Sequence, residues 1–156
     1  MKTLLILIGK TQNKHLIAGI DNYVNRIRHY MPFEIKVIPE LKNTKNLSKE
    51  IQKEKEGELL LKFIQPSDTL VILDENGTEF RSVELASWLQ NKQNTARRLV
   101  LSIGGPYGFS RSVYQRADGK ISLSRMTFSH QMVRLIFVEQ LYRACTIIKG
   151  EPYHHE

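Results

Sequence analysis

Cysteine is nearly absent from this chain of 156 residues, in which Cys145 stands alone. A single cysteine excludes an intramolecular disulfide, and the apolar neighbours Ile147 and Ile148 favour a buried structural thiol over a nucleophile. Long apolar runs are missing as well. The first run, at residues 4–8, stops at Gly9 and is too short for a signal peptide or a membrane span. We therefore expect a cytoplasmic protein with no membrane partner.

Three common binding motifs are also missing. Gly9-Lys10-Thr11 resembles the end of a P-loop, but that motif needs a glycine where Leu4 stands. No G-x-G-x-x-G follows the first predicted strand, which argues against an NAD or FAD site. The histidines lack the ligand spacing with cysteines or carboxylates that metal sites show, so we expect no metal. These histidines are at positions 15, 29, 130, 154 and 155.

Basic residues are plentiful: the 23 lysines and arginines outnumber the 16 acidic residues, giving a formal net charge of +7. Such a surface attracts polyanions, nucleic acid first, although net charge alone fits a merely soluble basic protein equally well. We expect RNA binding that weakens strongly with salt. The candidates for phosphate contacts are Lys10, Arg97, Arg98, Arg111, Arg116, Arg125 and Arg134.

Apolar, β-branched runs alternate with segments of helical periodicity, which predicts an α/β fold. The predicted strands cover residues 3–8, 33–38, 69–73, 99–103 and 121–123. We expect a mostly parallel sheet with helices on both faces, formed by residues 1–156 as a single domain. Ser82 and Ser110 are the expected N-caps of the third and fourth helices.

The final predicted helix begins near Ser129 and ends at Gly150. Its apolar residues cover much more of its surface than one stripe facing a sheet requires. A wholly internal helix would explain the excess, but a domain of this size has little room to surround one. We therefore favour a second copy of the chain as the partner of this helix.

Three loops follow predicted strands and should meet at the carboxyl edge of the sheet, where open α/β sheets bind ligands. The first is a turn at residues 74–77, in which Gly77 is expected to supply a positive φ. The second has glycines at 104, 105 and 108, and the third begins at Leu123. Bare glycine backbone permits close approach to a ligand, so we expect a crevice for a flat, polar-edged cofactor.

Together these motifs resemble the small SPOUT-class methyltransferases, of the bacterial type that methylates a pseudouridine of large-subunit ribosomal RNA. The resemblance extends over essentially the whole chain. One departure is Ser129, where the family commonly has proline. The resemblance rests on Ile8-Gly9-Lys10, Lys55-Glu56-Gly57-Glu58, Leu73-Asp74, Ile103-Gly104-Gly105-Pro106-Tyr107-Gly108, Leu123-Ser124, Met126-Thr127-Phe128-Ser129-His130, Val133-Arg134, Glu139-Gln140-Leu141-Tyr142-Arg143-Ala144 and Pro152-Tyr153-His154.

The resemblance implies a C-terminal trefoil knot that binds S-adenosylmethionine in a bent form, with loop backbone groups contacting the adenine. It also implies a homodimer through the last helix, and 23S ribosomal RNA as the substrate, within the assembled ribosome. The residues expected to line the cofactor site are Leu73, Gly104, Gly105, Leu123, Ser124, Arg125, Met126, Thr127 and Phe128.

Methylation of N3 of a pseudouridine requires loss of the N3 proton, and hence a base or an anion-stabilising donor. His130 is a candidate acceptor or orienting donor, although it is equally a structural residue at a helix start. Arg143 can stabilise a negative oxygen or hold a phosphate, and an exposed ion pair is the alternative. Tyr153 and His154 can stack on or hydrogen-bond the target base.

Two other functions remain open from the sequence. An RNA-binding or ribosome-assembly module without catalysis would use the same basic surface. A nucleotide hydrolase would use the glycine loop, but no nucleophile with an adjacent base is visible.

Overall fold

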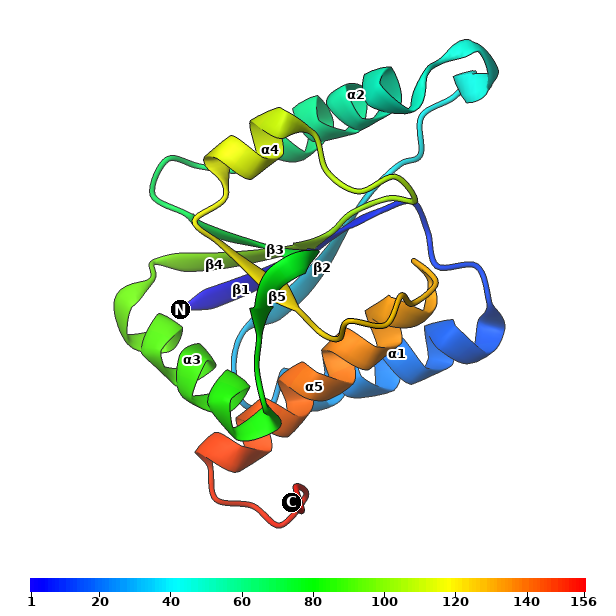
Figure 1. Cartoon of the computed structure of the whole chain (residues 1–156). Coiled ribbons are helices and arrows are strands. Elements are labelled where there is room, and N and C mark those ends of the chain that lie inside the picture. Colours follow the sequence, from blue (N-terminus) through cyan, green and yellow to red (C-terminus); the bar gives the residue numbers. More distant parts are fainter.

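A computed structural model describes residues 1–156 and contains one five-stranded sheet with all strands parallel. Figure 1 shows this sheet between two layers of helices. The strand order is β2-β1-β4-β3-β5. All five predicted strands are present, which confirms the α/β prediction and the parallel sheet. The strands are β1 (Lys2–Ile8), β2 (Phe33–Ile38), β3 (Thr69–Glu79), β4 (Arg98–Ile103) and β5 (Gly119–Ser122).

Helices cover both faces of the sheet, as predicted (Figure 1). One face carries α1 (Lys14–Ile27), α3 (Ser82–Thr95) and α5 (Met132–Ile148). The opposite face carries α2 (Lys49–Leu61) and the short α4 (Arg111–Arg116), and a 3-10 turn at Thr44–Asn46 precedes α2. None of these helices combines the length and apolar character needed to cross a membrane.

Each face of the sheet has its own apolar core, and β1 contributes to both. Leu5 and Leu7 pack with α1, α3 and α5, whereas Leu4, Ile6 and Ile8 pack with α2 and α4. Successive side chains of a strand point to opposite faces, so a strand buried on both faces must be apolar throughout. This requirement explains the continuous apolar run at the start of the chain.

Helix α5 packs against α1 and α3 as well as the sheet. It begins at Met132, three residues later than predicted, and Ser129 Oγ accepts a hydrogen bond from the Met132 N–H at 3.0 Å. Much of its apolar surface, including Phe137 and Leu141, is therefore buried within the chain itself. Cys145 is also buried, as predicted, and burial raises the pKa of its thiol to about 12.

Two local predictions were wrong. Gly77 does not have a positive φ, because β3 continues past a bulge to Glu79. A Cβ at Gly77 would lie 2.7 Å from the backbone of Ile121, so close approach of β5 requires the glycine. Ser82 is not an N-cap: the helix is capped at Arg81, and Ser82 Oγ donates to Gln140 Oε1 at 2.9 Å. Ser110 does cap α4, accepting from the Val113 N–H at 3.3 Å.

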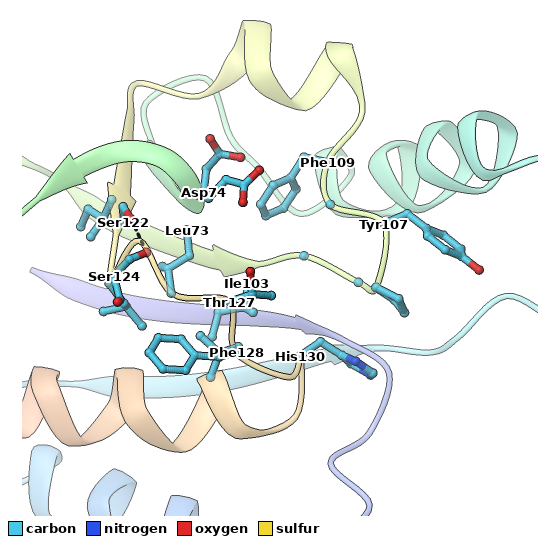
Figure 2. A pocket seen from close by; sticks show the side chains of 18 of the residues that line it. Leu73, Asp74, Ile103, Tyr107, Phe109, Ser122, Ser124, Thr127, Phe128 and His130 are labelled. Carbon is cyan, nitrogen blue, oxygen red and sulfur yellow. Dashed lines mark hydrogen bonds between the residues drawn. The ribbon is translucent and has the colours of Figure 1, made fainter.

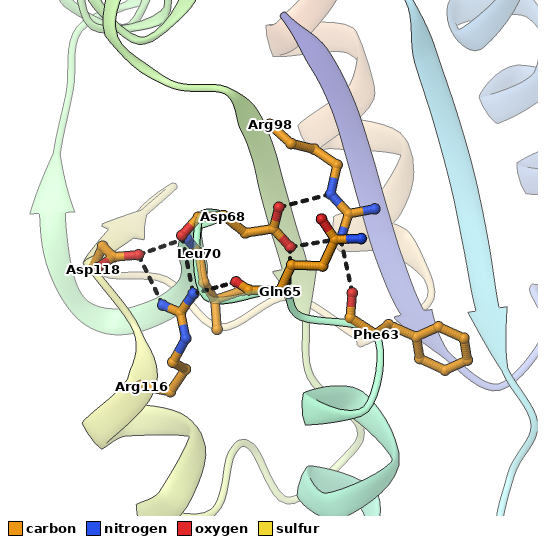
Figure 3. A network of polar contacts seen from close by, with 7 residues as sticks. All are labelled: Phe63, Gln65, Asp68, Leu70, Arg98, Arg116 and Asp118. Atoms are coloured by element: carbon orange, nitrogen blue, oxygen red, sulfur yellow. Dashed lines mark hydrogen bonds and ion pairs between the residues drawn. The ribbon is translucent and has the colours of Figure 1, made fainter.

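A polar network joins the amino ends of β3, β4 and β5 (Figure 3). Arg98 Nε donates to Asp68 Oδ1 at 2.9 Å, and Arg98 Nη2 also donates to the carbonyl of Phe63. Arg116 donates to Asp118 Oδ2 and to the carbonyls of Gln65 and Asp68, each at 3.0 Å. Asp118 in turn accepts from the Leu70 N–H at 2.8 Å.

Arg134 is held inside the chain in the same way. Only 1% of its surface is exposed, and it donates to the carbonyls of Ile8 and Gly9 and to Thr11 Oγ1. The prediction of a phosphate contact is therefore wrong for Arg134, whose guanidinium group is enclosed. Arg98 and Arg116 also bind partners within the chain, but both stay partly exposed, so their contacts with phosphate remain a prediction.

Candidate functional site

A pocket of about 600 Å³ lies at the carboxyl ends of β4 and β5, beside the bulge in β3. Figure 2 shows Leu73, Ile103 and the loop after β5 around it. The predicted loops after β4 and β5 do meet there, whereas the third predicted loop, at residues 74–77, is part of β3. Eight of the nine predicted cofactor residues line the pocket: Leu73, Gly104, Gly105, Leu123, Ser124, Met126, Thr127 and Phe128.

The loop after β4 contributes bare backbone to the pocket at its three glycines, beside Pro106 and Tyr107. Gly105 and Gly108 close a turn in which the Gly108 N–H donates to the Gly105 carbonyl at 3.1 Å. Gly108 has a φ of +82°, which side-chain-bearing residues rarely adopt. At Gly104, a Cβ would lie 3.3 Å from the ring of Phe109, so a larger residue would crowd the wall. The three glycines are needed for this conformation and close packing.

The opposite wall is the loop after β5, which is shaped by two serines. Ser122 Oγ donates to the Ser124 carbonyl at 3.1 Å, and Ser124 Oγ accepts from the Met126 N–H at 3.0 Å. Met126 is 76% exposed although it lines the pocket. Arg125 does not line it: its side chain is 90% exposed and its Nε donates to Glu79 Oε1 at 3.2 Å.

Asp74 and Tyr114 line the pocket too, although neither was predicted as a site residue. The Tyr114 hydroxyl donates to the Asp74 carboxylate. Burial, together with this hydrogen bond, raises the pKa of Tyr114, so the phenol keeps its proton. Asp74 directly follows the apolar run at residues 69–73, and this position was the signal in the sequence that could have identified it. Nothing in the sequence showed that Tyr114 of α4 reaches the same place.

The predicted catalytic residues fall into two separate places. His130 lines the pocket, just before α5 begins (Figure 2). Arg143, Tyr153 and His154 form a cluster at the other end of α5, which we call the tail cluster, and none of them lines the pocket. At 1.5 Å per residue, Arg143 lies about 16 Å along the helix from Met132.

Glu139 holds the tail cluster together. Glu139 Oε1 accepts from Arg143 Nη2 at 2.6 Å and from the Tyr153 hydroxyl at 2.9 Å. Hydrogen bonding to Glu139 raises the pKa of Arg143, and burial followed by hydrogen bonding raises the pKa of Tyr153. The arginine therefore stays cationic and the phenol stays protonated.

His154 completes the tail cluster. Its Nδ1 lies 3.2 Å from Arg143 Nη1, whereas its buried Nε2 has no hydrogen-bond partner within the chain. The nearest carboxylate is that of Glu156, whose Oε1 lies 4.0 Å from this nitrogen.

A parallel sheet with a glycine-rich pocket at its carboxyl edge defines an α/β protein with a candidate ligand site at that edge. The family model described as "Predicted SPOUT methyltransferase" matches residues 1–154. The chain therefore belongs to the SPOUT methyltransferase family.

Similar proteins match this chain over its whole length. Ribosomal RNA large subunit methyltransferase H of Phocaeicola vulgatus is 61% identical over an alignment of 157 positions, which covers 100% of both chains. The protein of the same name from Bacteroides fragilis is 60% identical with the same coverage. That of Christiangramia forsetii is 59% identical over 97% of each chain.

Solved structures share the fold at much lower identity. A probable methyltransferase from Bordetella pertussis Tohama I aligns with a TM-score of 0.55 at 10% identity, covering 92% of this chain and 96% of the other. A probable methylase family protein from Haemophilus influenzae Rd KW20 aligns with a TM-score of 0.52, also at 10% identity, over 99% and 70%.

Proposed function

We propose that this protein transfers a methyl group from S-adenosylmethionine to N3 of a pseudouridine in the RNA of the large ribosomal subunit. The observation that carries the proposal is 61% identity, over the full length of both chains, to a protein named as a large-subunit ribosomal RNA methyltransferase. The pocket at the carboxyl edge of the sheet supports it independently, because such an edge is where α/β enzymes hold their cofactors.

The pocket fits this methyl donor in size and lining. About 600 Å³ lies within the usual range for pockets that enclose a ligand of this size. Leu73, Ile103 and Leu123 offer apolar contact to a flat base, while Asp74 and Ser124 offer polar groups at its rim. When bound, S-adenosylmethionine supplies an electrophilic methyl group on a positively charged sulfur.

The residues of the chain must remove the N3 proton and stabilise the negative charge that its loss leaves. His130 lies in the pocket and is the proposed proton acceptor or orienting donor. Arg143 is cationic and presents a planar fork that suits a negative imide oxygen. Tyr153 and His154 are proposed to stack on or hydrogen-bond the target base.

A homodimer would bring these two groups together. His130 and the tail cluster are too far apart along α5 to act on one base within one chain. We propose that α5 packs against α5 of a second copy, so that the tail cluster of one chain completes the pocket of the other. Met132 is 43% exposed, and Ile136 and Ile147 are only partly buried, so apolar surface remains for such a contact.

The other expectations stay proposals of the same kind. We propose that residues 1–156 act as one domain with a C-terminal trefoil knot, in the cytoplasm, on RNA within the assembled ribosome. Arg125, which points away from the pocket, is proposed to contact RNA instead of the cofactor.

The deciding experiment supplies S-adenosylmethionine with a labelled methyl group to the protein together with assembled ribosomes, free large subunits or bare RNA. The expected result is label at N3 of one pseudouridine, strongest with assembled ribosomes. Thermal unfolding with and without the donor provides a second measurement, because binding to the native state must raise the midpoint. No label and no shift would leave an RNA-binding module as the better description.

A further inference from the structure

A buried carboxyl group lies directly behind the glycine wall of the pocket. Glu56 of α2 is only 6% exposed, yet its Oε1 has no hydrogen-bond partner. Its Oε2 has one weak contact, from Gln52 Nε2 at 3.5 Å. Burying a carboxylate with so few partners opposes folding, so such a group in a native protein calls for a functional reason.

The contact with Gly105 places this carboxyl group close to the pocket. A Cβ at Gly105 would lie 3.0 Å from Glu56 Oε1 and 3.3 Å from Oε2, so a larger residue there would crowd the carboxyl group. The small space around Glu56 is lined by Gly104, Gly105 and Gly108, and the same glycines line the large pocket. One layer of backbone therefore separates the carboxyl group from a bound cofactor.

No cation neutralises Glu56 within the chain. Lys53 borders the same space, but its ammonium pairs with Glu50 Oε1 at 3.0 Å. The other charged neighbour is Glu40, which is also acidic. Burial, with a smaller contribution from Glu40, raises the pKa of Glu56, while the contact with Gln52 lowers it. The ionised form would thus gain from a positive charge placed on the far side of Gly105.

We propose that Glu56 is a specificity-determining residue that favours the positively charged methyl donor over the uncharged product left after transfer. The inference rests on the proposed function. S-Adenosylmethionine and S-adenosylhomocysteine differ by one methyl group and one positive charge on sulfur. A negative charge behind one layer of backbone, shielded from water, stabilises only the charged member of this pair. Product would then be exchanged for fresh donor at the same pocket.

The test compares the dissociation constants of S-adenosylmethionine and S-adenosylhomocysteine by titration calorimetry. It uses the unmodified protein, Glu56→Gln and Glu58→Gln, at about pH 8.5, above the ordinary range of a glutamate. Glu58 is an exposed residue of the same helix, so its variant is matched in charge and differs in location. We expect Glu56→Gln to lower the preference for the donor by about fivefold, and Glu58→Gln to leave it unchanged.

Repeating the titrations from acidic to alkaline pH sharpens the test. The preference of the unmodified protein for the donor should rise as Glu56 ionises, whereas Glu56→Gln should show no such rise. The amino and carboxyl groups of the two ligands are the same, so their own ionisations cancel in the ratio. If Glu56 had a purely structural role, Glu56→Gln would weaken the binding of both ligands equally.

The possible failures are distinct. An unchanged ratio in Glu56→Gln, with both ligands still bound, would overturn the role of Glu56 and leave the proposed function intact. Failure of the unmodified protein to bind either ligand would overturn the proposed function itself.

Discussion

The two ends of the parallel sheet use charged residues in opposite ways. At the amino end, Asp68, Arg98, Arg116 and Asp118 bind one another and nearby backbone groups (Figure 3). At the carboxyl end, polar groups line an open pocket (Figure 2). The buried Oε1 of Glu56, behind that pocket, has no hydrogen-bond partner. The closed end contributes stability, whereas the open end retains groups that can still bind a ligand.

The difference shows why residue type alone did not separate enclosed arginines from free ones. An arginine at the start of a strand and one at the start of a helix look alike in a sequence. Arg98 is fixed by a buried aspartate, while Arg111 at the open end takes part in no ion pair of the structure. Arg134 is enclosed although it binds the carbonyls at the end of β1, so burial and partners within the chain decide whether a charge is available to RNA.

Removing Asp68 should have the largest effect, and it should act on stability alone. The Asp68 side chain is 1% exposed, so Asp68→Ala leaves the Arg98 guanidinium partly buried without its partner. We expect the free energy of unfolding to fall by about 3 to 5 kcal/mol, measured by urea denaturation. Donor affinity of the folded fraction should not change.

The exposed pair of Lys2 and Glu34 supplies the control, because more than half of each side chain is exposed. Glu34→Ala should lower the free energy of unfolding far less than Asp68→Ala does. Equal losses in the two variants would contradict the assignment of the amino end as a stabilising network.

At the open end, the largest effect should be on the rate of methyl transfer. His130→Ala and Arg143→Ala should each slow single-turnover methyl transfer by about 100-fold while leaving donor affinity within about twofold of the original. The reason is that these side chains are proposed to act on the N3 proton and on the charge it leaves. Full activity in both variants would remove them from the mechanism.

Mixing these two variants tests whether the tail cluster serves the pocket of another copy. Subunits carrying His130→Ala and Arg143→Ala should, after random exchange, recover about a quarter of the original activity, because half of the dimers then hold one intact site of two. The assay is methyl transfer after co-refolding, with sedimentation to confirm dimers. Without recovery, both groups would have to act within one chain or not at all.

A smaller effect is expected for the charges that face RNA. Arg111→Ala should weaken RNA binding several-fold and reduce the slope of log affinity against log salt by about 1. Arg116→Ala removes the same charge from the closed end, so it should lower thermal stability and change that slope less. Binding measured at several salt concentrations separates the two variants, and equal slopes would erase the distinction between the ends.

The smallest expected effect is on how the free energy of unfolding changes at acidic pH. Burial alone would raise the pKa of Asp68, but the hydrogen bonds from Arg98 and from the Gln65 N–H outweigh it and lower the pKa overall. The stabilisation is therefore present above the unfolded value of about 3.9 and is lost as pH falls through the lower folded value. Urea denaturation from about pH 6 to pH 3 should show a shallower decline in Asp68→Ala. An equal decline in both proteins would contradict this ion pair.

Strands and helices were predictable because burial restricts which residues a short segment can contain, and this restriction is visible in the sequence. The run at residues 99–103 is apolar apart from Ser102, since both faces of β4 are covered, and it became a strand within one residue of its predicted start. The same pattern located the pocket, because parallel strands carry their following loops to one edge. Gly77 was interpreted wrongly because the close approach of β5 involves residues more than forty positions away.

The pattern of apolar residues and glycines by itself determined the α/β class, the approximate positions of the strands and the two loops, after β4 and β5, that form much of the pocket. Only the tertiary structure decided that Arg125 does not line the pocket, that Arg134 is enclosed, and that His130 lines the pocket whereas Arg143 does not. The physical reason is the distance along the sequence between the residues that interact. Hydrophobic periodicity is set by neighbours a few residues away, whereas the partner of a charge is found wherever the fold brings an opposite charge or a carbonyl oxygen.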